Sequence, residues 1–152
     1  MNLPDKGTDR QPPAINAGRL KHLEIVQSVI SRMASNSFLV KGWNVTLLSA
    51  ILALALKDKV YDMLWVAFIP NVLFWILDGF FLQQERLFRK HWDTKRSEPQ
   101  DSATDFSMDT SSYRPQVSSW FGTMFSKTLL IFHGGLFIIL VAVVYFVPRG
   151  QG

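Results

Sequence analysis

Apolar residues in this chain of 152 amino acids are concentrated in three long runs separated by polar sequence. The central run covers residues 63–83 and continues as a basic segment to about residue 92. The other two runs cover residues 38–56 and 129–147. A helix needs about 20 predominantly apolar residues to cross a bilayer, and each run approaches that length. The pattern predicts an all-α membrane protein with three transmembrane helices, the first two joined as a hairpin by residues 57–62.

The first run is interrupted near its start by Lys41, Gly42 and Asn44. If Lys41 extends its amine to the interface, the helix is long enough to span the membrane, and half-insertion is the alternative. In the preceding segment, residues 19–37, apolar side chains recur every three or four positions, which is typical of an amphipathic helix. Its apolar face is expected to lie on the membrane surface, on a neighbouring subunit or on another part of the same chain.

Three segments lie outside these helices. Residues 1–18 are rich in proline and glycine and predict a disordered tail. Residues 93–118 are rich in Asp, Ser and Thr and predict a flexible loop. Residues 148–152 form a short tail after the third span.

The basic residues are distributed unequally over the predicted topology. Thirteen of the sixteen Lys and Arg residues lie on the side of the N-terminus and the long loop. Because Lys and Arg accumulate in cytoplasmic segments, this bias predicts a bacterial inner-membrane protein with a cytoplasmic N-terminus and an extracytoplasmic C-terminus. The same bias accounts for the net charge of +4, so no specific nucleic-acid partner is predicted.

Three polar residues, Asn71, Asp78 and Glu85, follow one another at intervals of seven along the central run. Seven residues are close to two helical turns, so the three side chains share one stripe of the helix. An ionised Asp facing lipid near the bilayer centre costs about 2.5–3.5 kcal/mol, and Asp78 should therefore face protein or water. Pro70, directly before the stripe, should kink the helix.

The predicted topology places Asp78, Lys41, Asn44 and His133 at one depth, near the inner leaflet. A buried carboxylate needs a cation or hydrogen-bond donors, so we expect Asp78 to pair with Lys41 or His133, within a subunit or across an interface. The alternative is a purely structural polar contact that fixes the register of the helices. Three glycines in the first and third spans should allow helices to approach closely: Gly42, Gly134 and Gly135.

The chain contains little that could carry catalysis or bind a metal. It has no cysteine, and its three histidines fall in different segments. Asp101, Asp105 and Asp109 recur every four residues, but the glycine turn and the bidentate Glu of a calcium loop are missing. We therefore predict no enzyme activity, no catalytic residue, no metal site and no cofactor.

The segments RMASNSFLVKGWNVTLLSAILALA and FWILDGFFLQQERLFRKHW, within residues 20–92, combine an amphipathic helix, a two-helix hairpin and a basic helix. This layout resembles the SLATT-type effector domains of prokaryotes, which occur near phage-defence genes. The resemblance implies a protein that oligomerises and perforates the inner membrane when triggered. The third span, residues 129–147, departs from the two-helix plan of that family.

Two functions are compatible with these patterns. The first is a homo-oligomeric pore or channel-like effector, in which Asn71, Asp78 and Glu85 line or gate a path between subunits. The second is a non-conducting accessory or scaffold subunit, which holds a cytoplasmic partner through residues 93–118. Both act in the lipid bilayer, and they differ in the access of water to Asn71 and Asp78.

Overall fold

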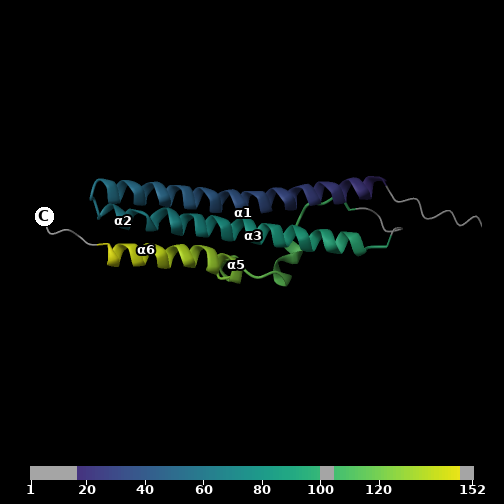
Figure 1. The fold of residues 1–152 in the computed structure, drawn as a ribbon. Coiled ribbons are helices and arrows are strands. Elements are labelled where there is room, and N and C mark those ends of the chain that lie inside the picture. Colours follow the sequence, from purple (N-terminus) through teal and green to yellow (C-terminus); the bar gives the residue numbers. More distant parts are fainter. Residues whose placement is uncertain (1–16, 100–104, 148–152) are drawn as a thin grey trace, which may run out of the picture.

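The computed structural model describes residues 17–99 and 105–147 and shows them as a long bundle of helices (Figure 1). These residues contain helices, turns and loops but no strand. Three helices are long and apolar enough to cross a membrane, which confirms the predicted all-α membrane fold. Of the predicted N-terminal tail, residues 1–18, the first sixteen lie outside the described residues, and the last two begin helix α1. The predicted C-terminal tail, residues 148–152, and Asp101 also lie outside the described residues. In chain order the elements are α1 (Ala17–Lys57), α2 (Met63–Val66), α3 (Phe68–Ser97), the 3₁₀-helix η1 (Ser111–Gln116), α4 (Trp120–Met124), α5 (Lys127–Leu129), the π-helix η2 (Leu130–Gly134) and α6 (Gly135–Phe146).

Helix α1 is a single helix of 41 residues, about 60 Å long at 1.5 Å per residue. The predicted amphipathic helix, residues 19–37, and the first predicted span, residues 38–56, are therefore parts of one element without a break at Lys41. The buried positions of α1 explain this continuity, because they recur at intervals of three, four or seven residues along one face. They are His22, Val26, Ile30, Ser37, Val40, Asn44, Leu48 and Ala55.

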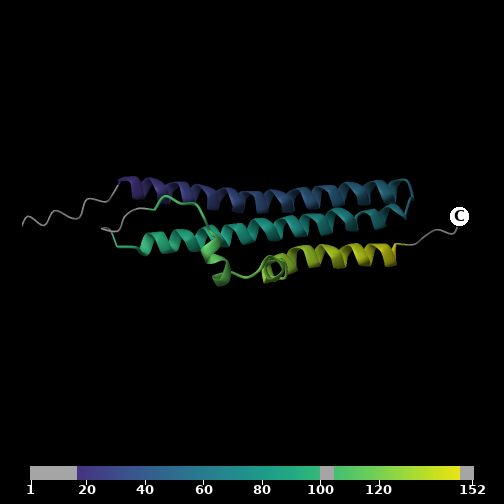
Figure 2. The ribbon, with the colours of Figure 1, turned by 180° about the vertical axis from the view of Figure 1, so that it is seen from behind.

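The buried stripe of α1 faces the antiparallel helix α3 along the bundle (Figures 1 and 2). His22, Asn44 and Ala55 are separated by multiples of eleven residues, and eleven residues are close to three helical turns. One straight stripe can therefore contact α3 over the whole length. Of the three alternatives for the amphipathic segment, the structure shows packing within the chain. We call residues 17–36 of α1 and 83–97 of α3, which extend beyond α6, the stalk.

The rest of the bundle, residues 37–57, 63–82 and 127–146, forms the membrane section. Two apolar clusters fill its half away from the stalk, one around Leu48, Ala67 and Leu140 and one around Ala55, Leu64 and Val144. Large apolar side chains on all three helices are exposed on its outer surface, where they can contact lipid; among them are Phe38, Trp43, Leu54, Trp65, Leu73, Ile131 and Ile138.

The central span is interrupted near its start, where α2 ends at Val66 and α3 begins at Phe68. Pro70 causes this interruption, because it has no N–H to donate to the carbonyl of Val66 one turn earlier. The turn is closed by tighter bonds instead, such as that from the Ala67 N–H to the Leu64 carbonyl at 3.3 Å. The distortion that Pro70 predicts thus lies in the first turns of the span.

After α3 the chain turns back along the stalk, forms η1 and α4, and then enters the third span (Figure 2). The segment predicted as a flexible loop, residues 93–118, therefore contains the last turn of α3 and the helix η1. The aromatic helix α4 contacts α3, and the Trp120 Nε1–H donates to the carbonyl of Ile76 at 3.3 Å. The predicted third span, residues 129–147, is helical from Lys127 to Phe146.

Close approach between helices occurs at a glycine that the sequence analysis did not select. A Cβ added at Gly42 or Gly135 would meet no atom within 4 Å, and one at Gly134 would meet only Leu130 of its own helical segment. Within one chain, these three glycines therefore bring no helices together. A Cβ added at Gly79 of α3, by contrast, would lie 2.5 Å from Cγ and 3.5 Å from Cα of Met124 in α4.

Replacing Gly79 with Ala should therefore push Met124 and α4 away from α3. We expect a loss of about 1–3 kcal/mol from overpacking, offset in part by the better helix propensity of alanine. Gly135→Ala is the matched control, because it gains the same propensity in open space and should unfold no earlier than the parent. Thermal unfolding in detergent measures both variants, and equal midpoints would contradict the close contact at Gly79.

Candidate functional site

A buried carboxylate, Asp78 of α3, lies in the stalk-side half of the membrane section and is satisfied from both other helices. Its side chain is completely buried. Oδ2 accepts from Lys41 Nζ of α1 at 2.6 Å and from His133 Nε2 of η2 at 2.9 Å. Oδ1 accepts the hydroxyl proton of Ser37 of α1. Three donors thus compensate one charge that would otherwise be costly in the apolar interior.

Ser37 and Lys41 are one helical turn apart on α1, so both side chains reach the same carboxylate. The ammonium of Lys41 also donates to Ser37 Oγ at 2.8 Å, which leaves the hydroxyl proton of Ser37 free to point at Asp78. The Lys41 side chain is 20% exposed and lies 6.0 Å from the ring centre of Phe132. Among the groups around Asp78, Lys41 is therefore the one in contact with the surroundings of the bundle.

Two asparagines extend this polar layer toward the apolar half of the membrane section. The amide of Asn44 donates to Asn71 Oδ1 at 2.9 Å and lies 3.2 Å from His133 Nδ1. Because an amide nitrogen can only donate, Nδ1 of His133 acts as the acceptor and its Nε2 carries the proton that points at Asp78. Asn44, Asn71, Asp78 and His133 are all completely buried. The layer joins α1, α3 and the third span into one hydrogen-bonded unit.

A π-helical turn places His133 in this layer. The third span has π-helical bonding from Leu130 to Gly134, between α5 and α6. One wider turn rotates the residues that follow it relative to a regular helix, and such turns are frequent at functional sites. The imidazole is then held flat against Trp75, with ring centres 5.9 Å apart and an interplanar angle of 10°. Trp75 is itself fixed by donating to the carbonyl of Met124 at 2.8 Å.

The structure brings together five of the residues that the sequence analysis selected for polar contacts: Lys41, Asn44, Asn71, Asp78 and His133. Both expected partners of Asp78 are present at once, and both come from the same chain. Glu85 is separate from this layer and pairs with Arg89 in the stalk. Ser37 and Trp75 were not selected; a polar residue four positions before Lys41 was the available signal for Ser37.

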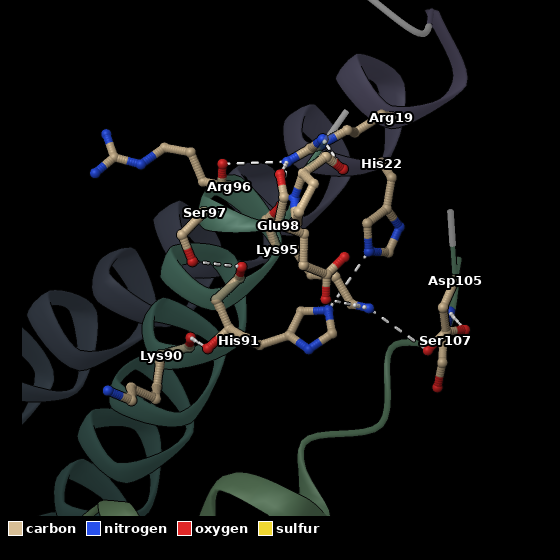
Figure 3. A network of polar contacts seen from close by, with 12 residues as sticks. Arg19, His22, Lys90, His91, Lys95, Arg96, Ser97, Glu98, Asp105 and Ser107 are labelled. Atoms are coloured by element: carbon tan, nitrogen blue, oxygen red, sulfur yellow. Dashed lines mark hydrogen bonds and ion pairs between the residues drawn. The ribbon is translucent and has the colours of Figure 1, made fainter. Parts of the chain in front are cut away.

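A second cluster of polar contacts lies in the stalk (Figure 3). His22 of α1 and His91 of α3 are buried, with their Nε2 atoms 3.4 Å apart. The returning chain covers them with aromatic edges, Phe106 on His22 at 5.8 Å and Tyr113 on His91 at 5.5 Å between ring centres. No group of three or more His, Asp or Glu residues in the described ranges could hold a metal ion.

The end of the stalk is closed by Arg19 of α1. Its guanidinium donates to the carbonyls of Lys95 at 2.9 Å, Arg96 at 3.1 Å and Pro99 at 3.1 Å, and also to that of Glu98 (Figure 3). These carbonyls belong to the last turn of α3 and the residues just after it, where intrahelical donors run out. A cation at this position also complements the negative end of the helix dipole.

The ion pair in the membrane section can be tested by a double-mutant cycle. Asp78→Leu leaves the ammonium of Lys41 without its carboxylate and should cost about 3–5 kcal/mol of unfolding free energy. Adding Lys41→Met removes the uncompensated charge, so the double variant should be more stable than the sum of the two single losses implies. Denaturation of the purified protein in detergent measures all four corners of the cycle. Strictly additive losses would mean that the two groups are not coupled.

The histidine pair predicts a pH dependence of the stalk. Burial lowers the pKa of His91 below its usual 6.5, and the charges of His22 and Lys95 lower it further. The opposing carboxylates of Asp105 and Glu98 are weaker influences on this pKa. At this site the unfolded chain then binds a proton more readily than the folded chain. The contribution of His91 to the free energy of unfolding is therefore fully present above about pH 6.5 and is lost as the pH falls below that value.

We expect proteolysis within residues 105–117 to accelerate as the pH falls from 7 toward 5, because protonation of His91 separates the stalk helices. His91→Gln removes the titrating group and should flatten the pH dependence without abolishing the fold. Limited proteolysis with a pH-independent protease, normalised to an unfolded substrate, follows the change. The same slope in His91→Gln and the parent would show that another group is responsible.

Comparisons with known proteins add no relative to this description: no model of a protein family matches the chain, and neither a curated protein nor a solved structure is significantly similar to it. The resemblance to SLATT-type domains thus stays a prediction from layout.

Proposed function

We propose that this chain is a non-conducting anchor subunit of the bacterial inner membrane, which holds its stalk in the cytoplasm as a binding surface for a protein partner. The observation that carries the proposal is the position of Asn71 and Asp78. Both are completely buried inside one chain, where their polar groups bind Asn44, Lys41 and His133. Residues that a pore would expose to water are already satisfied by protein.

The apolar half of the membrane section supports the same proposal. Beyond Asn44 and Asn71, the interior is filled by the two clusters around Leu48 and Ala55. A path for ions or protons needs polar groups or water through the whole thickness of the bilayer. The polar layer therefore reaches the surroundings of the bundle through Lys41 and is closed by apolar side chains on the side away from the stalk.

The stalk supports the binding part of the proposal. Its α1 part extends about 30 Å from the membrane section, a length given by 20 residues at 1.5 Å each, and it is paired with the 15 residues of the α3 part. Its exposed residues include polar Gln27, Ser28 and Ser31 and also apolar Leu20 and Ile25. Arg19 and the histidine pair hold the two helices together, so the surface is presented in one fixed arrangement. Preorganised surfaces bind partners at a lower entropic cost.

The distribution of charge supports the orientation. The segments on the stalk side carry thirteen of the sixteen Lys and Arg residues, and cytoplasmic segments of membrane proteins carry this excess. A pore formed by several chains remains the other candidate from the sequence, but it would need Asp78 to leave three donors within its own chain before it could face a central axis.

A panel of single-cysteine variants tests the proposal, because the chain has no cysteine of its own. In native membranes, Asn71→Cys should resist a water-soluble maleimide, whereas Ser112→Cys, on an exposed residue of η1, should react rapidly. Gln27→Cys on the stalk should react in the purified protein but be protected in native membranes, where the partner is bound. Labelling is measured by the gel shift of each variant.

Each cysteine reports on a separate part of the proposal. Rapid labelling of Asn71→Cys would reveal water in the polar layer and favour a conducting protein. Equal labelling of Gln27→Cys in membranes and in the purified protein would argue against a bound partner. Ser112→Cys serves as the positive control for reagent access.

A further inference from the structure

A groove of about 440 Å³ lies where the membrane section meets the stalk, between α3 and the returning segment of η1 and α4. Its apolar wall is made by Phe80 and Leu87 of α3 and by Trp120 of α4. Its polar wall contains Arg114 of η1 and Ser119. The groove therefore combines an apolar surface with a cation, where the membrane section meets the stalk.

The position of the groove relative to the membrane follows from its neighbours. Phe80 is near the end of the apolar part of α3 and is exposed to the outside of the bundle. On α4 and just after it, the large aromatic rings of Phe121 and Phe125 are also exposed. Exposed aromatic residues of this kind collect at the level of lipid headgroups. The groove thus opens at headgroup depth, in the leaflet on the stalk side.

The polar groups of the groove select for a negative ligand. The side chains that line it include one guanidinium, the two carboxamides of Gln83 and Gln84, and one hydroxyl, but no carboxylate. Ser119 Oγ accepts from the Gly122 N–H at 3.2 Å, which leaves its own proton to donate. Guanidinium and hydroxyl donors suit the oxygens of a phosphate diester.

We propose that this groove binds one anionic phospholipid from the leaflet on the stalk side, with Arg114 against the phosphate and Phe80 and Trp120 along the acyl chains. An anionic lipid fits better than a zwitterionic one because the lining offers no carboxylate to receive a choline or ethanolamine cation. It fits better than a soluble phosphate because half of the wall is apolar. Basic pockets on the cytoplasmic side of membrane proteins commonly take such lipids.

The binding would also link α3 to the returning chain. Gln83 and Phe80 come from α3, whereas Arg114 and Trp120 come from η1 and α4. A lipid that contacts both walls would hold η1 on the stalk, where Tyr113 already covers His91. The groove is separate from the polar layer around Asp78, so this proposal does not depend on whether the chain conducts.

The test compares binding of phosphatidylglycerol and phosphatidylcholine to the purified full chain by native mass spectrometry, with the parent, Arg114→Gln and Lys127→Gln. The parent should retain phosphatidylglycerol at a concentration about fivefold lower than phosphatidylcholine, the effect of about one basic residue near a membrane surface. Arg114→Gln should lose this preference. Lys127→Gln removes an exposed cation outside the groove and should keep it.

Three outcomes would overturn the proposal. The first is equal retention of the two lipids by the parent. The second is an unchanged preference in Arg114→Gln, which would place the lipid elsewhere. The third is full competition by glycerol phosphate without acyl chains, which would indicate a soluble phosphate ligand. Arg114 is exposed, and the thermal midpoint of each variant without added lipid verifies that the fold is intact.

Discussion

The charge of Asp78 is the constraint on which the arrangement of the helices depends. A carboxylate in the membrane section must be matched by donors, and here the donors come from α1 and from the third span. Lipid tails are as apolar as leucine, so burial of apolar surface alone selects no particular face of a membrane helix. The polar layer determines which face of each helix turns inward, because only one face of α1 and one face of the third span carry donors for Asp78. Rotating α1 or the third span by one residue would remove Ser37 and Lys41, or His133, from the carboxylate.

The layer also explains local features that would otherwise be defects. The π-helical turn from Leu130 to Gly134 breaks the regular bonding of the third span, yet it turns His133 toward Asp78 and against Trp75. Gly79 follows Asp78 directly and leaves space for Met124, whose carbonyl receives the indole proton of Trp75. Side-chain pairing in the layer and close backbone contact beside it therefore position the entry to the third span together.

Much of the fold follows from the sequence, because the physical signals are local. Runs of apolar residues predict the three spans, and the interval of seven between Asn71 and Asp78 places both on one face. Partners at one depth predict that Lys41 or His133 reaches Asp78, and the structure has both. The missed features depend on distant atoms. The π-helical turn has no local signature. The amphipathic pattern left three alternatives for its apolar face, and only the position of α3 distinguishes packing within the chain from the other two. Gly79 was missed because its importance comes from Met124, 45 positions later in the chain.

The two polar clusters lie on the same pair of helices, and this gives the stalk its relation to the membrane. His22 and Ser37 belong to one straight stripe of α1, and His91 and Asp78 belong to the facing side of α3. Since α1 has no break between them, a change of register in the stalk would have to shift Ser37 and Lys41 against Asp78. The cost of disturbing that buried carboxylate resists such a shift. Within this fold, the membrane section is therefore what fixes the geometry of the stalk surface.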